Sequence, residues 1–149
     1  CWCEGFYRCL GVDYYERYKS WKFVRDHERE NNLCERLNLP DKYAFVVNRY
    51  GGKRKKAFHL EIQSQSHYDG LPHVNPARFV KSTLIFDWMK VIENATEIHV
   101  VDTAWMHLIK NMMLKQPKFL WRKARHVPAS DANYLNDKYN TGWTDVLHH

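Results

Sequence analysis

The sequence predicts an α/β domain with three layers, in which helices flank a small, mostly parallel, Rossmann-like sheet. Short apolar runs alternate with segments of helical periodicity, which is the pattern of βαβ units. The main runs are apolar throughout, as expected of parallel strands buried on both faces. The chain has 149 residues and is 44% hydrophobic, so it can form one domain with a substantial core.

Residues 1–40 are predicted to form an aromatic and helical segment that packs on the domain. Several tyrosines precede a stretch of strong helix formers at residues 25–37. Leu33 and Leu37 are spaced as on one face of a helix, and Pro40 ends the stretch. We expect the part before this helix to be a linker or wrapping segment and not a core element.

Residues 41–127 are predicted to form a nucleotide-binding-like α/β core. Apolar runs there are separated by glycine, proline and asparagine, which favour turns. In order along the chain we expect a strand at 43–48, a loop at 48–53, a weaker strand at 57–63, an irregular loop at 64–76, a brief strand at 78–80, a helix at 82–95, a strand at 97–101, a helix at 103–114 and a short strand at 119–121.

Residues 128–149 are predicted to be an irregular C-terminal tail. Pro128, Gly142 and several asparagines interrupt any periodic pattern there. A short helix near Trp143 is the regular element that we expect in this part.

The net charge of the chain is +6 with histidine neutral, which favours anionic partners such as phosphates, nucleotides, nucleic acid or acidic lipid. A basic run at 53–56 is either a solvated loop or an anion-binding one. No apolar stretch reaches the ~18 to 20 residues of a membrane span. Nothing in the sequence suggests secretion, so we expect a cytoplasmic protein with reduced thiols.

The histidines and cysteines do not follow the spacing of a metal site. None of the nine histidines belongs to an H-x3-H or H-E-x-x-H motif, and Cys1 and Cys3 lack the C-x2-C spacing of zinc ribbons. We therefore expect neither a metal nor a cofactor. Glu28, Glu30, Asp69 and Asp87 are available acids, but nothing in the sequence pairs them.

Ligands of parallel α/β sheets bind outside the carboxyl ends of the strands, so the loops there are candidate sites. The strongest is the strand-to-helix junction Asp102-Thr103. The N–H groups of a first helical turn lack internal partners and carry partial positive charge. Together with the Thr103 hydroxyl they could hold a phosphate. The alternative is plain N-capping of the helix by Asp102 or Thr103.

His107 follows Thr103 by four residues and so shares its helix face. Its imidazole could donate a hydrogen bond to the same phosphate, or it could pack as an ordinary helix residue. His99, in the preceding strand, is expected to be a core or sheet-edge residue. Lys123 and Arg125 could add positive charge at the same place. Further candidates in the ligand loops are Asn48, Arg49, Gly51, Gly52, Lys81 and Ser82.

One segment resembles the signature of glycosyltransferases with the GT-B fold, in particular the heptosyltransferase-like group. Its pattern is Ile92-x-x-Ala95-x-x-Ile98-x-x-x-Asp102-Thr103-x-x-x-His107-Leu108. In that group a helix ending in Ala and a strand precede Asp-Ser/Thr-Gly-x-x-His-Leu, and Ala104 stands here at the Gly position. The chain is also similar to short GT-B-like proteins of bacteria and phages, through residues 7–11, 21, 25–26, 43–47 and 122–125. The resemblance covers residues 6–125.

The resemblance implies that the chain corresponds to the second domain of a GT-B enzyme, which binds the diphosphate of a nucleotide-sugar at the helix start. His107 would be catalytic by stabilising the leaving diphosphate, without a metal. The acceptor and often the catalytic base come from the first domain in these enzymes, so a missing first domain or a partner chain is implied. The diphosphate-binding residues would be Asp102, Thr103, Ala104, Lys123 and Arg125.

Two other functions are compatible with the residues. A basic, non-catalytic module could bind a nucleotide, nucleic acid or a partner protein, although nucleic acid is not the favoured ligand. Its stacking surface would be the exposed aromatics Tyr14, Tyr15, Tyr18 and Trp21, beside Lys19 and Lys22. The same aromatics could equally form the face that meets a missing first domain or a partner chain. A small enzyme acting on a nucleotide-containing metabolite is the other alternative.

Overall fold

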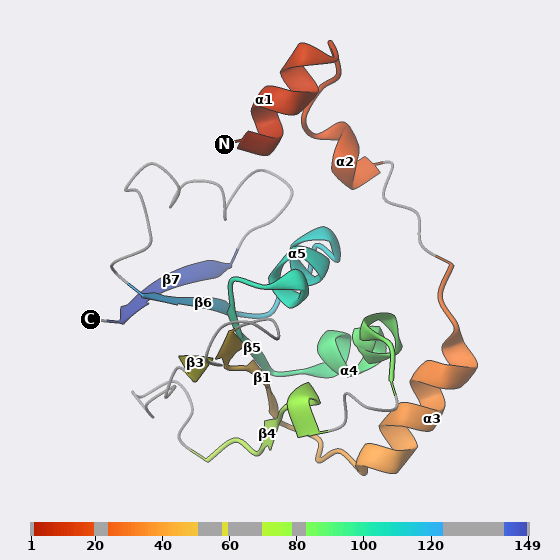
Figure 1. The fold of residues 1–149 in the computed structure, drawn as a ribbon. Coiled ribbons are helices and arrows are strands. Elements are labelled where there is room, and N and C mark those ends of the chain that lie inside the picture. The colour runs from red at the N-terminus through yellow and green to blue at the C-terminus, as the bar shows by residue number, and fades with distance from the viewer. Residues whose placement is uncertain are drawn as a thin grey trace.

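The computed structural model of the chain describes residues 2–19, 24–50, 58–59, 70–78, 83–123 and 142–148. It confirms the predicted α/β class, because helices pack beside a five-stranded, all-parallel, Rossmann-like sheet (Figure 1). A separate antiparallel pair of short strands follows the end of the first strand. In spatial order the main sheet contains β4 (His73–Val74), β1 (Ala44–Val47), β5 (Glu97–Val101), β6 (Lys118–Lys123) and β7 (Trp143–His148), and the pair contains β2 (Arg49–Tyr50) and β3 (Phe58–His59).

The order of the strands reverses at β1. The chain places β4 on one side of β1 and then crosses back to place β5 on the other side. Counted along the chain, the spatial order is 2-1-3-4-5, which is the order of flavodoxin-like doubly wound sheets. Ligands of such sheets bind at the carboxyl ends of the two strands where the order reverses. We call this place the switch point; it is bordered by Asn48, which follows β1, and by Asp102, which follows β5.

Three helices lie on one side of the sheet, with α4 and α5 beside the strands and α3 outside α4 (Figure 1). Two further short helices, α1 and α2, stand at the N-terminal end, apart from the sheet. The helical elements are α1 (Trp2–Cys9), α2 (Glu16–Lys19), α3 (His27–Leu37), the 3-10 turns η1 (Pro76–Arg78) and η3 (Ile85–Trp88), α4 (Met89–Asn94) and α5 (Ala104–Asn111).

Residues on both faces of the sheet are buried, although the helices described beside it cover only one face. Successive strand residues point to opposite faces, and both Phe45 and its neighbour Val46 are almost inaccessible to solvent. Phe45 faces the helices, where its ring centroid lies 6.2 Å from that of Trp88 and 5.6 Å from that of Trp105. His99 is aligned with Val46 on the other face and is fully buried. Each large apolar side chain buried in this way contributes roughly 1.5–3 kcal/mol.

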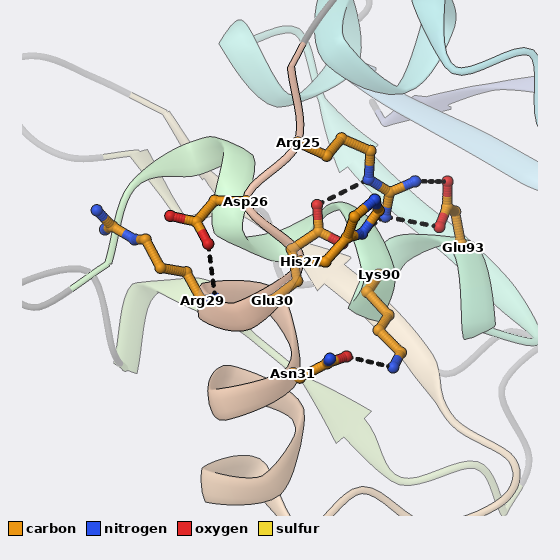
Figure 2. A network of polar contacts seen from close by, with 8 residues as sticks. All are labelled: Arg25, Asp26, His27, Arg29, Glu30, Asn31, Lys90 and Glu93. Carbon is orange, nitrogen blue, oxygen red and sulfur yellow. Dashed lines mark hydrogen bonds and ion pairs between the residues drawn. The ribbon is translucent and has the colours of Figure 1, made fainter.

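A polar network joins α3 to α4 (Figure 2). Asp26 caps α3, since its side chain accepts a hydrogen bond from the backbone N–H of Arg29 at 3.0 Å. Arg25 lies between two carboxylates and donates to Glu30 at 2.5 and 2.7 Å and to Glu93 at 2.6 and 2.9 Å. These bonds raise the pKa of the Arg25 guanidinium. Glu30 is only 1% exposed, and His27 Nδ1 also lies 3.7 Å from its carboxylate.

The predicted helices at 25–37, 82–95 and 103–114 are present but shorter. The second begins as the 3-10 turn η3, because the Asp87 carboxylate accepts from the backbone N–H of Leu84 at 2.8 Å and holds the chain in a tight turn. The third ends at Asn111, and Met113 has a positive φ of 51°, a left-handed conformation that stops a helix. Two of the acids that the sequence does not pair have arginine partners in the structure, since Glu30 binds Arg25 and Asp87 binds Arg29 at 2.8 Å.

Two strands lie where the sequence predicts irregular structure. β4 occupies two residues of the predicted loop at 64–76, and β7 occupies residues 143–148 of the predicted tail, so both predictions are wrong there. Gly142, which precedes β7, has a positive φ of 78° and turns the chain toward β6. The Gly142 carbonyl then accepts a hydrogen bond from the backbone N–H of Lys118 at 2.8 Å, which fixes the start of β7 beside β6. Arg49 belongs to β2 and not to a loop, and Arg78 ends η1 and does not begin a strand.

The strands predicted at 43–48, 97–101 and 119–121 are confirmed as β1, β5 and the middle of β6. Of the weaker strand predicted at 57–63, only residues 58–59 lie in the described part, and they form β3. The division into segments 1–40, 41–127 and 128–149 stays a prediction.

Candidate ligand site at the carboxyl edge

The parallel register brings several predicted site residues to one edge of the sheet. Val47 of β1 is aligned with Val100 of β5, so the chain leaves both strands at nearly the same level. Asn48 and Asp102 therefore follow neighbouring strands, which lie ~4.8 Å apart. Lys123 ends β6 on the other side of β5. The sheet thus gathers residues that are more than fifty positions apart in the sequence.

The start of α5 at this edge has no side-chain cap. Thr103 holds the N-cap position in an extended conformation, and its side chain accepts no hydrogen bond from the first helical turn. Its hydroxyl instead donates to the carbonyl of Val101 at 3.2 Å. The alternative of plain capping by the Thr103 side chain is therefore wrong. First-turn N–H groups that lack a cap are a favourable place for an anion.

His107 lies one turn after Thr103, as the spacing predicts, and it is exposed. Its backbone N–H approaches the Thr103 carbonyl at 3.4 Å, and its carbonyl accepts from the Asn111 side chain at 2.7 Å. Ala104 and Asp102 are exposed as well. The Asp102 carboxylate would repel a phosphate placed close to it, so it is better suited to accept a hydrogen bond from a hydroxyl group.

Asn75 belongs to the same edge and was not found from the sequence. It follows β4, and its Nδ2 donates to Asn48 Oδ1 at 3.0 Å. Its own Oδ1 accepts from the backbone N–H of Ala77 at 2.9 Å. The sequence places Asn75 beside Pro76 in a stretch that favours turns. A strand of two residues has no periodicity that could have revealed it.

The remaining predicted site residues are not tested by the structure. Their roles in ligand binding stay predictions. Only the backbone of Arg49 and Lys123 is described, while Gly51, Gly52, Lys81, Ser82 and Arg125 lie outside the described residues.

His99 is a core residue, as expected, and its tautomer follows from its partners. The indole N–H of Trp121 points at His99 Nδ1 at 3.1 Å. An indole N–H can only donate, so Nδ1 accepts and the ring proton lies on Nε2. That nitrogen is 3.2 Å from a carboxylate oxygen of Glu97, and the ring stacks on Phe119 at 4.5 Å. Both ring nitrogens are thus engaged inside the sheet, away from any ligand at its edge.

A cavity of about 610 Å³ lies away from the carboxyl edge, where α3 and α4 end. Tyr43, which immediately precedes β1, forms part of the cavity wall. The cavity therefore lies at the amino edge of the sheet. The Tyr43 hydroxyl donates to the Val91 carbonyl at 2.6 Å, and burial raises the pKa of this phenol. Cys34, also in the wall, is a free thiol whose pKa is raised by burial.

Within the described ranges, no group of three His, Cys, Asp or Glu side chains is placed to hold a metal ion. None of the helices described is long and apolar enough to cross a membrane.

Comparisons of the chain with protein-family models, with curated proteins and with solved structures found no match. The glycosyltransferase resemblance therefore rests on the motif residues alone.

Proposed function

We propose that this domain binds the diphosphate of a nucleotide-sugar at the switch point, as the donor-binding part of a GT-B-like glycosyltransferase. The observation that carries the proposal is the coincidence of two features. The strand order reverses between β1 and β5, and the helix that begins directly after β5 has no side-chain cap. The first feature is where doubly wound sheets bind ligands, and the second favours an anion.

In this proposal the backbone N–H groups at Ala104 and Trp105 bind the diphosphate, and the Thr103 hydroxyl turns from the Val101 carbonyl toward it. His107, exposed one turn later, donates a hydrogen bond to a phosphate oxygen. As the sugar leaves, negative charge grows on the diphosphate, and donors already in place stabilise it without reorganisation. Asp102 accepts from a sugar hydroxyl of the same ligand.

The proposal is tested by thermal unfolding with nucleoside diphosphates and nucleotide-sugars. A ligand at a hundred times its Kd stabilises the native state by ~2.7 kcal/mol, which raises the Tm of a domain of this size by roughly 5–10 °C. We expect this shift in the wild type and its loss in Thr103→Val and His107→Ala. Thr96→Val is the matched control, because Thr96 is exposed at the opposite end of β5.

The two possible failures have different meanings. A shift that persists in Thr103→Val and His107→Ala would place the ligand elsewhere on the molecule. No shift with any nucleotide would reject the donor site altogether.

A second candidate function, a non-catalytic assembly module, is favoured by the N-terminal helices. Phe6 and Leu10 are 61% and 62% exposed and Val12 is 42% exposed, an apolar group of the kind found at protein interfaces. Stacking on nucleic acid is less favoured than predicted, because Tyr18 is buried and not exposed. If this surface binds a partner or a second copy, the double variant Phe6→Glu, Leu10→Glu will abolish assembly in light scattering without lowering the Tm.

A further inference from the structure

The helix α3 is attached at the margin of the domain. It lies outside α4 and packs mainly on α4 and η3 (Figure 1). Residues 38–42, which join α3 to β1, include no buried residue, and Asn38 takes a left-handed conformation with a φ of 45°. The chain can therefore bend at this loop while the pairing of the strands stays intact.

Few apolar side chains hold α3 in place. Of its eleven residues only Glu30 and Leu33 are buried, and Glu30 is a charged residue. By contrast, the eight residues of α5 include Met106, Leu108 and Ile109, which are all buried. Elements with few buried apolar contacts open at a lower free energy than the core. We therefore expect α3 to open more easily than α5.

The side-chain contacts that tie α3 to its neighbours are largely polar (Figure 2). Within the described residues they join Arg25 to Glu93 at 2.6 and 2.9 Å, Arg29 to Asp87 at 2.8 Å, and Asn31 to Lys90 at 2.5 Å. The side chains of Arg25 and Glu93 are 22% and 36% exposed, so dissolved salt reaches this pair and weakens it.

We propose that α3 is a separately opening unit, which leaves α4 while the parallel sheet stays folded, and that the contact between Arg25 and Glu93 holds it closed. Cys34, Glu35 and Asn38 form one side of the cavity at the amino edge. Opening of α3 removes that side and exposes the surface of α4 beneath it. The inference is independent of the proposed ligand site at the carboxyl edge.

Native-state hydrogen exchange in low concentrations of urea tests the opening. After correction for intrinsic rates, amides of residues 30–37 should exchange roughly 10- to 100-fold faster than those of β5. Their opening should also depend less on urea, because it exposes less surface than global unfolding does. Equal protection of α3 and β5, with the same dependence on urea, would overturn the inference.

The variant Trp143→Ala separates local opening from global unfolding. Trp143 is buried in β7, so its contacts persist when α3 alone opens. The substitution should speed exchange in β5 roughly 100-fold or more, but exchange in α3 by less than about twofold. The same acceleration in both elements would show that α3 opens only when the whole domain unfolds. If the variant does not fold, the urea series on the wild type decides the question.

The variant Arg25→Met tests the contact that holds α3 closed. Exchange in α3 should become roughly tenfold faster or more. In the wild type, raising sodium chloride from about 0.05 to about 1 M should speed α3 exchange roughly twofold or more, and this response should be lost in the variant. Asn32→Ala, at an exposed position of α3, is the matched control and should not speed exchange. Unchanged α3 exchange in Arg25→Met would overturn the role given to this contact.

Discussion

Lys118 is a buried lysine whose protonated form is destabilised by burial. It has no exposed surface, and its Nζ donates to the carbonyls of Leu114 at 2.6 Å and Gln116 at 3.1 Å. The ring of Trp143 lies 5.9 Å away. Burial lowers the pKa of Lys118 from 10.5 to about 8, because the charged form loses its hydration. Because of this residue, the free energy of unfolding should vary with pH in the alkaline range.

The sign of this dependence follows from the two pKa values. In the unfolded chain Lys118 keeps its proton up to about pH 10.5, and in the folded chain only up to about 8. The folded state is therefore favoured as the pH rises through this interval, and the stabilisation is lost as the pH falls through 8. We expect the free energy of unfolding of the wild type to gain on the order of 1–2 kcal/mol over Lys118→Met between pH 7.5 and 10. If urea unfolding shows that the free energies of unfolding of the two proteins change with pH in the same way, this expectation is wrong.

At the scale of elements, the Arg25 network fixes α3 against α4. Arg25 precedes α3, Glu30 lies within it, and Glu93 lies on α4, so one guanidinium holds both helices (Figure 2). A buried ion pair adds little net stability, but removal of one partner leaves a buried charge uncompensated. The network therefore adds charged hydrogen bonds to the contact between α3 and α4.

The change Arg25→Met should lower the free energy of unfolding by about 2–4 kcal/mol, because Glu30 is left buried without the two hydrogen bonds of the guanidinium. The matched control is Arg29→Met. Arg29 binds Asp87, but Arg29 is about half exposed and Asp87 also accepts from the Leu84 N–H, so the loss of Arg29 should cost clearly less than the loss of Arg25. Urea unfolding measures both. Equal effects would show that the buried carboxylate does not depend on Arg25.

At the scale of the whole molecule, β7 completes a sheet that would otherwise end at β6. Its first residue, Trp143, is 5% exposed and belongs to the same hydrophobic core as Leu120 and Ile98. Residues 143–148 are therefore part of the fold. Truncation within this strand would expose one full edge of β6.

Trp143→Ala should lower the free energy of unfolding by about 3–5 kcal/mol, the usual cost of removing a large buried aromatic side chain. The loss should appear in a single unfolding transition followed by circular dichroism, since the strand belongs to the common core. If residues 143–148 behaved as the irregular tail that the sequence predicts, the substitution would change stability by less than about 0.5 kcal/mol.

Strong periodicity explains which parts of the fold could be predicted. The strand at 97–101 and the helix after it are marked by a continuous apolar run and then by apolar residues at helical spacing, so the junction at Asp102 was placed correctly. β4 has two residues and β7 follows a stretch rich in turn-forming residues. Neither has a local signal, and both are stabilised by strands far away in the sequence.

The polar contacts were harder to predict than the strands. Asn48 and Asn75 are 27 positions apart, and Arg25 and Glu93 are 68 apart. No spacing rule relates such pairs, because tertiary folding alone brings them together. The sequence therefore indicated the edge at which to search for a site, but not the amide pair beside it.

The interior position of β1 between two strands that come later in the sequence has a consequence for synthesis of the chain. Both neighbours of this four-residue apolar strand come later in the sequence, and β5 ends at Val101. A ribosome adding ~5–20 residues per second therefore needs roughly three to ten seconds after Val47 before that strand can be enclosed on both sides. Throughout this time the hydrophobic segment is exposed and can associate with other nascent chains. The yield of native protein should therefore depend on translation speed and on chaperones that bind the segment.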